Sequence, residues 1–511
     1  MYIPLPTPKE MGLWDKITIE KIGISGEILM ENAARQCVYA LFDEIGNVKQ
    51  KKVAIFAGPG NNGGDGFAVG RILNEYGADI TVFHKKDISE YKNDAKYHAE
   101  LAVKLGVKTS YITDDININD YDIIIDALLG TGFSGTLRED YERLISLINE
   151  QKNKSFILAI DIPSGLNGYT GNPSPIAVEA DITVTFEEAK VGLYLPHAKK
   201  YVGKLVIGKI GIPNLVKKEN PPSFWGITPD ILKKIPDISD FDHKGKAAHV
   251  LIIGGAKGLT GATTLCAIGA LKAGAGLVTV ALPYLCSLNL KLSWPEIMIL
   301  PLGKKESDVF NKEMFYEIKD ELKRFDAVVI GPGMGRDKGA LEFLKEYLTH
   351  EHPSTIIDAD ALFNLSKLDL NETSIPSDTI LTPHPGEAGY LLGIKTMKIL
   401  EDRYNALTQI VDKFKCISIL KGPGTLVCDL NKKIYISNIA CKNLAIGGSG
   451  DVLAGVIGFL KARGDKSLDA ACIGVMWHGL AGELLKEKFP KRGNLAHDIA
   501  YVLPEVLVRW K

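Results

Sequence analysis

The stretch KKVAIFAGPGNNGGDGFAVGRIL, residues 51–73, decides the fold of the first half of this 511-residue chain. Its apolar run 53–56 predicts a strand buried on both faces, and the glycine-rich stretch 58–66 predicts a tight turn. The apolar spacing of 67–73 predicts a helix. A strand that leads through a glycine turn directly into a helix is typical of parallel α/β sheets. We therefore expect a Rossmann-like parallel sheet with helices on both faces.

Strand-like and helix-like segments alternate along the rest of the first half as well. Helical spacing covers 1–45, 89–105 and 139–150, and strand-like apolar runs cover 78–84, 121–130, 155–165 and 180–190. A proline-rich and charge-rich segment, 211–245, then interrupts the alternation. Within it, 213–227 has no sustained apolar period and is interpreted as a linker.

The alternation restarts after this interruption. A strand is expected at HVLIIGG (249–255), followed by a helix, and the last clear element is the helix DVLAGVIGFLKARG (451–464). Further strand-then-loop units are expected at 276–283, 326–335, 354–362, 379–387 and 416–424. The sequence thus predicts an α/β protein with two domains, residues 1–218 and 226–511.

The composition excludes several classes of protein. There are 60 Lys and Arg against 62 Asp and Glu, a net charge of −2, which gives no support for a nucleic-acid or membrane-surface binder. Seven cysteines without a Cys-x-x-Cys pair favour the reducing cytoplasm over a disulfide framework. No signal peptide is apparent. The uncharged run Ala273–Leu290 contains Pro283 and is interpreted as a strand plus a turn rather than a membrane span.

The glycines of GPGNNG (58–63) match the spacing of a dinucleotide-binding turn, which would hold a pyrophosphate at a helix N-terminus. In such sites an acid ends the next strand, about 20 residues further on. Here that strand ends in HKK (84–86), and the nearest acid, Asp79, begins it. The pattern therefore disfavours a hydride-transferring Rossmann enzyme. A turn without a ligand also fits the glycines, but it leaves the polar residues of NNGGD (61–65) unexplained.

Polar side chains follow three strands that we expect to be neighbours in the first sheet. They are Asn62, Asp126 and the pair Asp161 and Ser164. Ligands of open α/β sheets bind at the carboxyl ends of the strands. Asn62, Asp126 and Ser164 therefore form a candidate oxygen site for a cation, with Asp161 as an acid or base beside it. A strand-end Asp can also simply cap a helix.

The most informative stretch of the second half is NLAIGGSGDVLAGVIGFL, residues 443–460. Its glycines leave backbone N–H groups free to face anionic oxygens where a helix begins. Asp451 stands at that helix start, where a carboxylate can take a proton from a substrate hydroxyl during phosphoryl transfer. The simpler alternative is an Asp stabilised by the helix dipole. The glycines before it favour the catalytic interpretation.

Other polar residues in the second half remain open. His384 lies between two prolines and is either a loop residue or a substrate contact. No Cys or second His stands at ligand spacing from it, so the pattern does not predict a metal site there. Asp358 and Asp360 end a strand and either position a metal or substrate or cap a helix.

Four segments of the first half, 18–34, 57–73, 126–135 and 161–171, resemble NAD(P)H-hydrate epimerases. These enzymes interconvert the two epimers of hydrated NAD(P)H, and the resemblance covers nearly all of residues 10–215. It implies that K⁺ binds to Asn62, Asp126 and Ser164 and that Asp161 is catalytic. It implies substrate contacts at Asn61, Asn62, Gly63, Gly64, Asp65, Gly130, Thr131, Gly132, Phe133, Ser134, Gly135, Thr136 and Asp161.

The second half resembles ribokinase-like enzymes and, among them, NAD(P)H-hydrate dehydratases, over nearly all of residues 228–505. The segments that show this are 243–283, 328–335, 356–362, 381–387, 420–425 and 443–460. The resemblance implies substrate contacts at Ala262, Gly333, His384 and Asp451, with Asp451 catalytic. It implies nucleotide contacts at Lys421, Gly422, Pro423, Gly424, Thr425, Gly447, Gly448, Ser449 and Gly450. Ala248, Cys441 and Ile446 depart from the family pattern.

Together the two resemblances imply a bifunctional enzyme that repairs hydrated NADH and NADPH (NADHX and NADPHX). The epimerase would convert one epimer into the other, and the dehydratase would use ADP or ATP with Mg²⁺ to restore NAD(P)H. ADP is favoured, which would release phosphate and AMP. The resemblance also implies a homo-oligomer without nucleic-acid or membrane partners, in which Met30-Glu31-Asn32 lies at an interface or at the epimerase site.

Two other functions fit part of the sequence. A ribokinase-like small-molecule kinase with an N-terminal ligand-binding domain would make a stable phosphorylated product. A first half that only binds or interacts would not need Asp161 or the NNGGD stretch (61–65).

Overall fold

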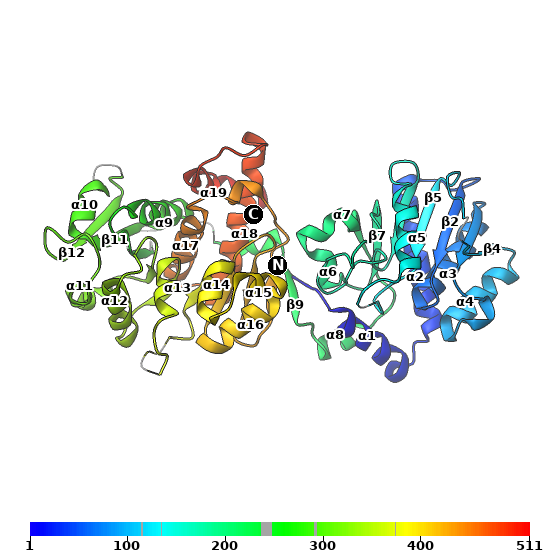
Figure 1. Ribbon diagram of the computed structural model, residues 1–511, viewed down its shortest axis with the longest axis horizontal. Coiled ribbons are helices and arrows are strands. Elements are labelled where there is room, and N and C mark those ends of the chain that lie inside the picture. The colour runs from blue at the N-terminus through cyan, green and yellow to red at the C-terminus, as the bar shows by residue number, and fades with distance from the viewer. Residues whose placement is uncertain (114–115, 134, 237–247, 291–293, 372, 374) are drawn as a thin grey trace. The chain divides into compact units, whose positions relative to one another are not determined.

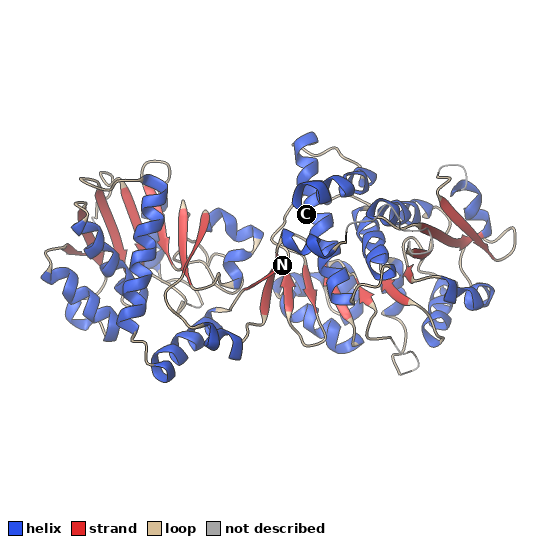
Figure 2. Ribbon diagram, turned by 180° about the vertical axis from the view of Figure 1, so that it is seen from behind, coloured by secondary structure: helices blue, strands red, loops and turns tan. Residues whose placement is uncertain are grey.

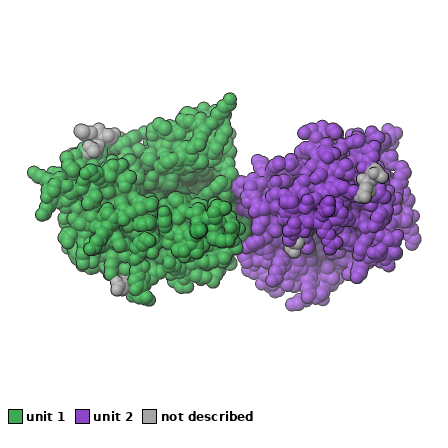
Figure 3. Space-filling model, in the orientation of Figure 1, with its two compact units in different colours: residues 1–3, 226–511 green, residues 4–225 purple. Residues whose placement is uncertain are grey.

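The computed structural model describes residues 1–113, 116–133, 135–236, 248–290, 294–371, 373 and 375–511. These residues form two compact units, which Figure 3 shows in different colours. The N-terminal unit is Pro4–Trp225, and the C-terminal unit is Gly226–Lys511 together with Met1–Ile3.

The N-terminal unit is built on a parallel sheet with the strand order β4-β3-β2-β5-β6-β7-β8. Its strands are β2 (Lys52–Ala57), β3 (Asp79–His84), β4 (Lys108–Tyr111), β5 (Ile123–Ala127), β6 (Phe156–Ile160), β7 (Ile182–Phe186) and β8 (Lys204–Gly208). The order reverses direction between β2 and β5, so loops leaving these two strands diverge and open a crevice.

Helices cover both faces of this sheet (Figures 1 and 2). The larger core packs α2, α3 and α4 on the side chains of Val53 and Ile55, and the other core packs α5 on Ala54 and Phe56. The helices are α1 (Pro8–Ile17), α2 (Gly26–Ile45), α3 (Asn61–Glu75), α4 (Asn93–Lys104), α5 (Glu139–Asn149), α6 (Val191–Tyr194), α7 (Lys199–Val202) and α8 (Asn214–Glu219). The predicted parallel sheet with helices on both faces is confirmed.

The C-terminal unit contains a larger sheet, with the order β1-β9-β18-β17-β16-β15-β14-β13-β10-β11-β12. It is parallel from β12 to β16, and β17 and β18 continue it antiparallel. The strands are β1 (Tyr2–Pro4), β9 (Phe224–Ile227), β10 (His249–Ile253), β11 (Leu277–Pro283), β12 (Ile297–Leu302), β13 (Ala327–Ile330), β14 (Ser354–Ile357), β15 (Ile380–Leu381), β16 (Ile417–Leu420), β17 (Leu426–Cys428) and β18 (Ile434–Ile436). In this second sheet, the strand order reverses between β10 and β13.

Helices also pack on this second sheet (Figure 1). They are α9 (Thr260–Ala273), α10 (Tyr284–Leu290), α11 (Lys312–Ile318), α12 (Lys338–Thr349), α13 (Asp360–Leu365), α14 (Pro385–Leu392), α15 (Thr396–Glu401), α16 (Arg403–Phe414), α17 (Ser449–Ala462), α18 (Ser467–Lys488) and α19 (Ala496–Trp510). The expected α/β class of the second half is confirmed.

Several expected elements differ in the structure. The helical span 1–45 contains strand β1, helix α1, a π-helical turn (Thr18–Ile22) and helix α2, because Gly23 adopts a left-handed φ of +89° and Ser25 caps α2. The expected linker 213–227 contains α8 and β9. The turn expected after β11 is helix α10. Strands β4 and β8 were not anticipated; both are partly exposed, and β4 also lacks an apolar run.

Helices α18 and α19 were missed as well, and α18 is the more instructive. It is buried nearly all round, so it shows no contrast between a polar and an apolar face. Among the described residues no helix combines the length and the apolarity needed to cross a bilayer. All seven cysteines are described, and each is a free thiol.

Helices α9 and α17 approach so closely that their contact requires glycine. A Cβ added to Gly455 on α17 would lie 2.0 Å from the carbonyl oxygen of Cys266 on α9. We predict that Gly455→Ala destabilises the C-terminal unit by about 1–3 kcal/mol, because two helix backbones must separate. Thermal unfolding of the full chain measures this. Gly261→Ala on α9, which has open space around it, is the control and should not lower the melting temperature; equal destabilisation by both changes would contradict the packing argument.

Candidate active sites

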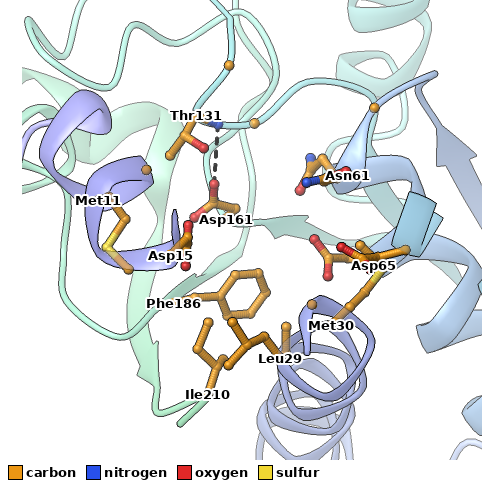
Figure 4. A pocket seen from close by; sticks show the side chains of 18 of the residues that line it. Met11, Asp15, Leu29, Met30, Asn61, Asp65, Thr131, Asp161, Phe186 and Ile210 are labelled. Atoms are coloured by element: carbon orange, nitrogen blue, oxygen red, sulfur yellow. Dashed lines mark hydrogen bonds between the residues drawn. The ribbon is translucent and has the colours of Figure 1, made fainter. Parts of the chain in front are cut away.

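The first cavity lies at the carboxyl ends of β2 and β5, where the strand order of the N-terminal unit reverses. It has a volume of about 710 Å³, and Figure 4 shows the side chains that surround it. Its walls come from α1, α2, the start of α3, the loops after β5 and β6, and the segment around Lys190. Met30 lines it, so part of the Met30-Glu31-Asn32 segment belongs to this cavity.

Asp161 is the residue directly after β6 and has a left-handed backbone, with φ of +65°. Its Oδ1 accepts a hydrogen bond from Lys190 Nζ at 2.5 Å, and its Oδ2 accepts one from the N–H of Thr131 at 3.3 Å (Figure 4). Lys190 is only 1% exposed, and its ammonium also donates to Thr185 Oγ1 at 3.0 Å and to the carbonyl of Phe186 at 3.3 Å. Asp161 and Lys190 thus form a buried ion pair.

Asp15, Asp65 and Asp94 also line this cavity, and Asp15 and Asp65 lie in a different electrostatic environment from Asp161. Burial raises the pKa of Asp15 to about 6, and the carboxylates of Asp161 and Glu187 add to the rise against Lys190. Burial also raises the pKa of Asp65 well above its usual value, with Asp161 and Asp15 adding to it. Carboxyl groups whose surroundings differ in this way are suited to separate acid and base roles.

The three predicted cation ligands lie close together, but only Asn62 lines the cavity, whereas Asp126 and Ser164 are buried outside its lining. Asp126 accepts Ser164 Oγ at 2.6 Å and the Ser164 N–H at 2.7 Å, and burial raises its pKa to about 6. Asn62 donates to the carbonyl of Leu129 at 2.9 Å, while its own Oδ1 is buried without a hydrogen-bond partner. An unpartnered oxygen beside a carboxylate, a hydroxyl and a carbonyl suits a hard monovalent cation.

Only some residues of the predicted substrate-binding segments line the cavity. They are Asn61, Asn62, Asp65, Gly130, Thr131, Gly132 and Phe133. Gly63 and Gly64 are buried behind it, where a Cβ would collide with Gly58 and with Ala95. Gly135 and Thr136 lie outside the lining, and Ser134 lies outside the described residues.

The second cavity lies in the C-terminal unit, at the carboxyl ends of β14, β15 and β16, and has a volume of about 580 Å³. Helix α17 begins in its wall, and Gly448, the residue before this helix, has a left-handed φ of +88°. The predicted residues that line this cavity are His384, Lys421, Gly422, Pro423, Thr425, Gly447, Gly448, Ser449, Gly450 and Asp451.

Lys421 is the centre of the charge arrangement in this cavity. Its ammonium donates to Asp358 Oδ1 at 2.7 Å and lies 3.7 Å from Glu387 Oε2. Burial raises the pKa of Asp451 to about 7, with Asp358 adding to the rise and Lys421 opposing it. Burial likewise raises the pKa of Glu387 to about 7. Asp358 therefore pairs with a lysine rather than capping a helix, and Asp451 is poised for proton transfer near neutral pH.

His384 is the N-cap of helix α14, which the sequence did not anticipate. Its Nδ1 accepts the N–H groups of Gly386 at 2.9 Å and Glu387 at 3.3 Å, and Glu387 Oε2 accepts the N–H of His384. These bonds require an unprotonated Nδ1, so the neutral ring has its proton on Nε2. Burial lowers the pKa of His384, which keeps this form at neutral pH.

Two arginines support the loops of the second cavity and were missed in the sequence. Arg403 donates to the carbonyls of Pro423 at 2.7 Å and Gly424 at 3.1 Å and so fixes the 421–425 loop. Arg492 lines the cavity and donates to the carbonyl of Ala445. Neither stands in a glycine-rich motif, so only the three-dimensional structure relates them to the site.

Three predicted residues lie away from the lining of the second cavity. Gly424 stands in the loop held by Arg403 but outside the lining. Gly333 follows β13, and Ala262 is in the first turn of α9 after β10. A Cβ on Gly333 would lie 2.4 Å from the carbonyl of Leu259, so these two residues flank the crevice between β10 and β13, where the strand order reverses.

The residues that depart from the family pattern occupy different places. Cys441 and Ile446 line the second cavity, whereas Ala248 is buried directly before β10. Asp360 accepts Arg336 Nε at 2.7 Å at the start of α13. Within the described residues no group of three or more His, Cys, Asp or Glu side chains is placed to hold a metal ion.

Each unit thus combines an α/β sheet, a glycine-rich loop at strand ends and a carboxylate suited to proton transfer, which defines a two-site enzyme. Residues 250–505 match the family model of NAD(P)H-hydrate dehydratase, and residues 26–192 match that of the YjeF-related protein N-terminus. A bifunctional NAD(P)H-hydrate repair enzyme from Moorella thermoacetica is 34% identical over 512 residues, covering 98% of this chain and 96% of that relative. The one from Dictyoglomus turgidum is 32% identical over 513 residues, covering 98% and 97%.

The chain belongs to the family of bifunctional NAD(P)H-hydrate repair enzymes. It is an enzyme that joins an epimerase, an isomerase activity, to a nucleotide-dependent dehydratase, a lyase activity. Among solved structures, an ADP/ATP-dependent NAD(P)H-hydrate dehydratase from Bacillus subtilis, co-crystallised with ATP/Mg²⁺, is similar with a TM-score of 0.48 and 23% identity, covering 56% of this chain and 98% of that one.

The two roles of His384, cap and substrate contact, can be separated by substitution. We predict that His384→Ala lowers the stability of the C-terminal unit by about 1 kcal/mol, the usual cost of a lost N-cap. His384→Asn keeps a capping acceptor and should unfold at nearly the wild-type temperature, while both variants lose dehydratase turnover. Thermal unfolding and dehydration rates measure the two effects; equal melting temperatures for the two variants would contradict the capping role.

Proposed function

We propose that the N-terminal unit epimerises hydrated NAD(P)H and that the C-terminal unit dehydrates the S epimer with ADP. The main support is that each unit has its own cavity at strand ends, with its own buried lysine and carboxylates. We assign the two activities to Pro4–Trp225 and Gly226–Lys511, close to the expected domains 1–218 and 226–511. Seven free thiols support a reducing compartment, the cytoplasm, and we retain the expected homo-oligomer as part of the proposal.

In the epimerase, Asp161 would accept the proton of the substrate hydroxyl. Its ion pair with Lys190 and its contact with the Thr131 N–H fix the position of the carboxyl group. Loss of that proton lets a bond at the hydrated carbon open, and re-formation on the other face gives the other epimer. The start of α3 at 61–65 and the loop 130–133 would hold the rest of the substrate, with backbone N–H groups at the start of α3 facing its phosphates.

The oxygen atoms next to this cavity are suited to bind K⁺. Asn62, Asp126 and Ser164 would hold it, because the Asn62 Oδ1 is a buried oxygen without a partner. A bound cation would supply a fixed positive charge close to the substrate phosphates. Here the protein residues also order the loop itself, since Ser164 Oγ accepts the N–H of Leu129 at 2.9 Å.

In the dehydratase, Asp451 would remove the proton of the substrate hydroxyl, which then attacks the terminal phosphoryl group of the nucleotide. With ADP this step gives a phosphate ester and AMP. The ring nitrogen of the substrate then expels phosphate, and loss of a neighbouring ring proton restores NAD(P)H. The N–H groups of 447–450 and the ammonium of Lys421 are suited to the charge on the transferring group.

Mg²⁺ fits the same cavity. It usually binds one or two carboxylates together with nucleotide phosphates, and the carboxylates of Asp358 and Glu387 line the wall. Bound there, it would neutralise phosphate charge. The 421–425 loop, fixed by Arg403, and the 447–450 loop would hold the nucleotide, and His384 would present its Nε2–H to the substrate.

The two proposed sites should be separable by single substitutions. We predict that Asp451→Asn abolishes ADP-dependent recovery of NADH from hydrated NADH and leaves epimerisation intact, whereas Asp161→Asn does the reverse. Asn tolerates the left-handed backbone at position 161. Reduced-nicotinamide absorbance and chromatography of the two epimers measure the activities. In the wild type, dehydration should rise with pH through about 7, because Asp451 must be deprotonated to act as a base.

Three results would contradict this assignment. They are no NADH recovery by the wild type with ADP or ATP, loss of both activities in one folded variant, and a stable phosphorylated product. The last would favour a small-molecule kinase instead.

The cation requirement can be tested separately. We predict that replacing K⁺ with tetramethylammonium lowers epimerisation and the melting temperature of the N-terminal unit, because Asn62 Oδ1 and Asp126 lose a partner. Dehydration of the pure S epimer provides the internal control, and Asp126→Asn should remove the dependence. Epimerisation that is equal in both salts would contradict a cation site at Asn62.

A further inference from the structure

Asp15 is a carboxylate of the first cavity that the sequence motifs did not single out. It lies on helix α1, one turn after Met11, and both residues line the cavity. Figure 4 shows Asp15 next to Asp161, on the same side of the cavity, whereas Asp65 projects from the opposite side. Two carboxyl groups on two different elements therefore face the same space.

Helix α1 holds Asp15 firmly in this position. Trp14, the preceding residue, is fully buried and donates from Nε1 to the carbonyl of Asn220 at 2.9 Å. At the start of the helix, Thr7 and Glu10 form a reciprocal capping box, and Glu10 also accepts the N–H of Ser223 at 2.9 Å. Trp14 anchors one face of α1 in the core, and this orients the neighbouring side chain, Asp15, toward the cavity.

The surroundings of the two carboxyl groups differ. Asp161 receives a lysine ammonium and a backbone N–H, but within the described part of the chain no group donates to the carboxyl of Asp15. The charged groups near Asp15 are Asp161, Glu187, Lys190 and, across the cavity, Asp65. Glu187 is paired with Lys217 at 2.7 Å, and Lys190 is directed at Asp161. Among the described residues Asp15 lacks such donors, and burial raises its pKa to about 6, so this carboxyl group is suited to carry a proton.

We infer that Asp15 is the second proton-transfer residue of the epimerisation, the partner of Asp161. This inference rests on the proposed function of the N-terminal unit. The hydroxyl oxygen and the ring nitrogen are bonded to the same substrate carbon, so two neighbouring carboxyl groups on one side of a cavity can serve both atoms.

The reaction balances with these two groups alone. Asp161 takes the hydroxyl proton, the carbon–oxygen bond becomes a carbonyl, and the carbon–nitrogen bond breaks. Its electron pair goes to the ring nitrogen, which takes the proton of Asp15. Rotation of the open chain exposes the other face of the carbonyl, and the reverse transfers close the ring as the other epimer. Both carboxyl groups return to their starting protonation states.

The full-length chain with four single variants tests this role. Asp15→Asn keeps the shape but removes the proton donor, and should lower kcat of epimerisation about 10²–10⁴-fold, the usual size of a general acid contribution, with little change in KM. Asp15→Glu should recover part of the rate. Glu20→Gln, an exposed acid just beyond α1, is the matched control and should equal the wild type. Asp65→Asn tests the carboxyl across the cavity and should keep more activity than Asp15→Asn.

The pH dependence provides a readout that a purely structural role would not change. Wild-type epimerisation, corrected for the spontaneous rate, should fall as the pH rises through the pKa of Asp15, since the donor must be protonated. Asp15→Asn should lose this falling limb. In every variant, dehydration of the S epimer with ADP should remain at the wild-type rate, and the N-terminal unit should unfold at the wild-type temperature, which shows that this unit is folded.

The results that would contradict the role of Asp15 differ from the result that would contradict the proposed function. A folded Asp15→Asn variant with more than half the wild-type kcat, or a change in KM only, would overturn the inference while leaving the proposed function in place. A large loss in Asp65→Asn with none in Asp15→Asn would assign the role to Asp65 instead. A wild-type chain without epimerisation above the spontaneous rate would overturn the proposed function itself.

Discussion

The close approach of neighbouring loops at the point where the strand order reverses determines both halves of this protein. In the N-terminal unit, a Cβ on Gly58, after β2, would lie 1.8 Å from the carbonyl oxygen of Leu128, after β5. In the C-terminal unit, a Cβ on Gly254, after β10, would lie 2.1 Å from the carbonyl oxygen of Pro332, after β13. Only glycine fits either position. The two backbones cross before they diverge, and the space beyond each crossing is where a ligand of an open α/β sheet binds.

The two proposed sites use a buried lysine in different ways. In the N-terminal unit, Lys190 pairs directly with Asp161, the proposed base. In the C-terminal unit, Lys421 pairs with Asp358 rather than with Asp451, and burial raises the pKa of Asp451 to about 7. The lysine therefore contacts the proposed base in the first site and a neighbouring carboxylate in the second.

Much of the architecture could be predicted from the sequence because the strands of parallel sheets are short apolar runs followed by glycine-rich loops. The glycine-rich stretches 58–66 and 447–450 both lie where a helix begins, as expected, but α3 already begins at Asn61, so the predicted turn is shorter than 58–66. Strands β4 and β8 were missed because edge strands are partly exposed, and α18 because it is buried nearly all round. For the sites, motifs identified Asp161 and Asp451, but Asp15 and Lys190 stand outside any glycine-rich motif. Their relation to Asp161 exists only after α1 and the segment after β7 have folded against the loops.

Strand β1 places the first residues of the chain in the sheet of the C-terminal unit, next to β9. Tyr2 packs on Tyr435 of β18, with ring centroids 5.0 Å apart, and its hydroxyl lies 3.4 Å from Asp469 Oδ1. During synthesis, β1 leaves the ribosome before more than two hundred residues that separate it from β9. It therefore has to stay unpaired while the whole N-terminal unit is made, and it docks only when the second sheet assembles. The C-terminal unit is thus completed by a segment that is translated before the N-terminal unit.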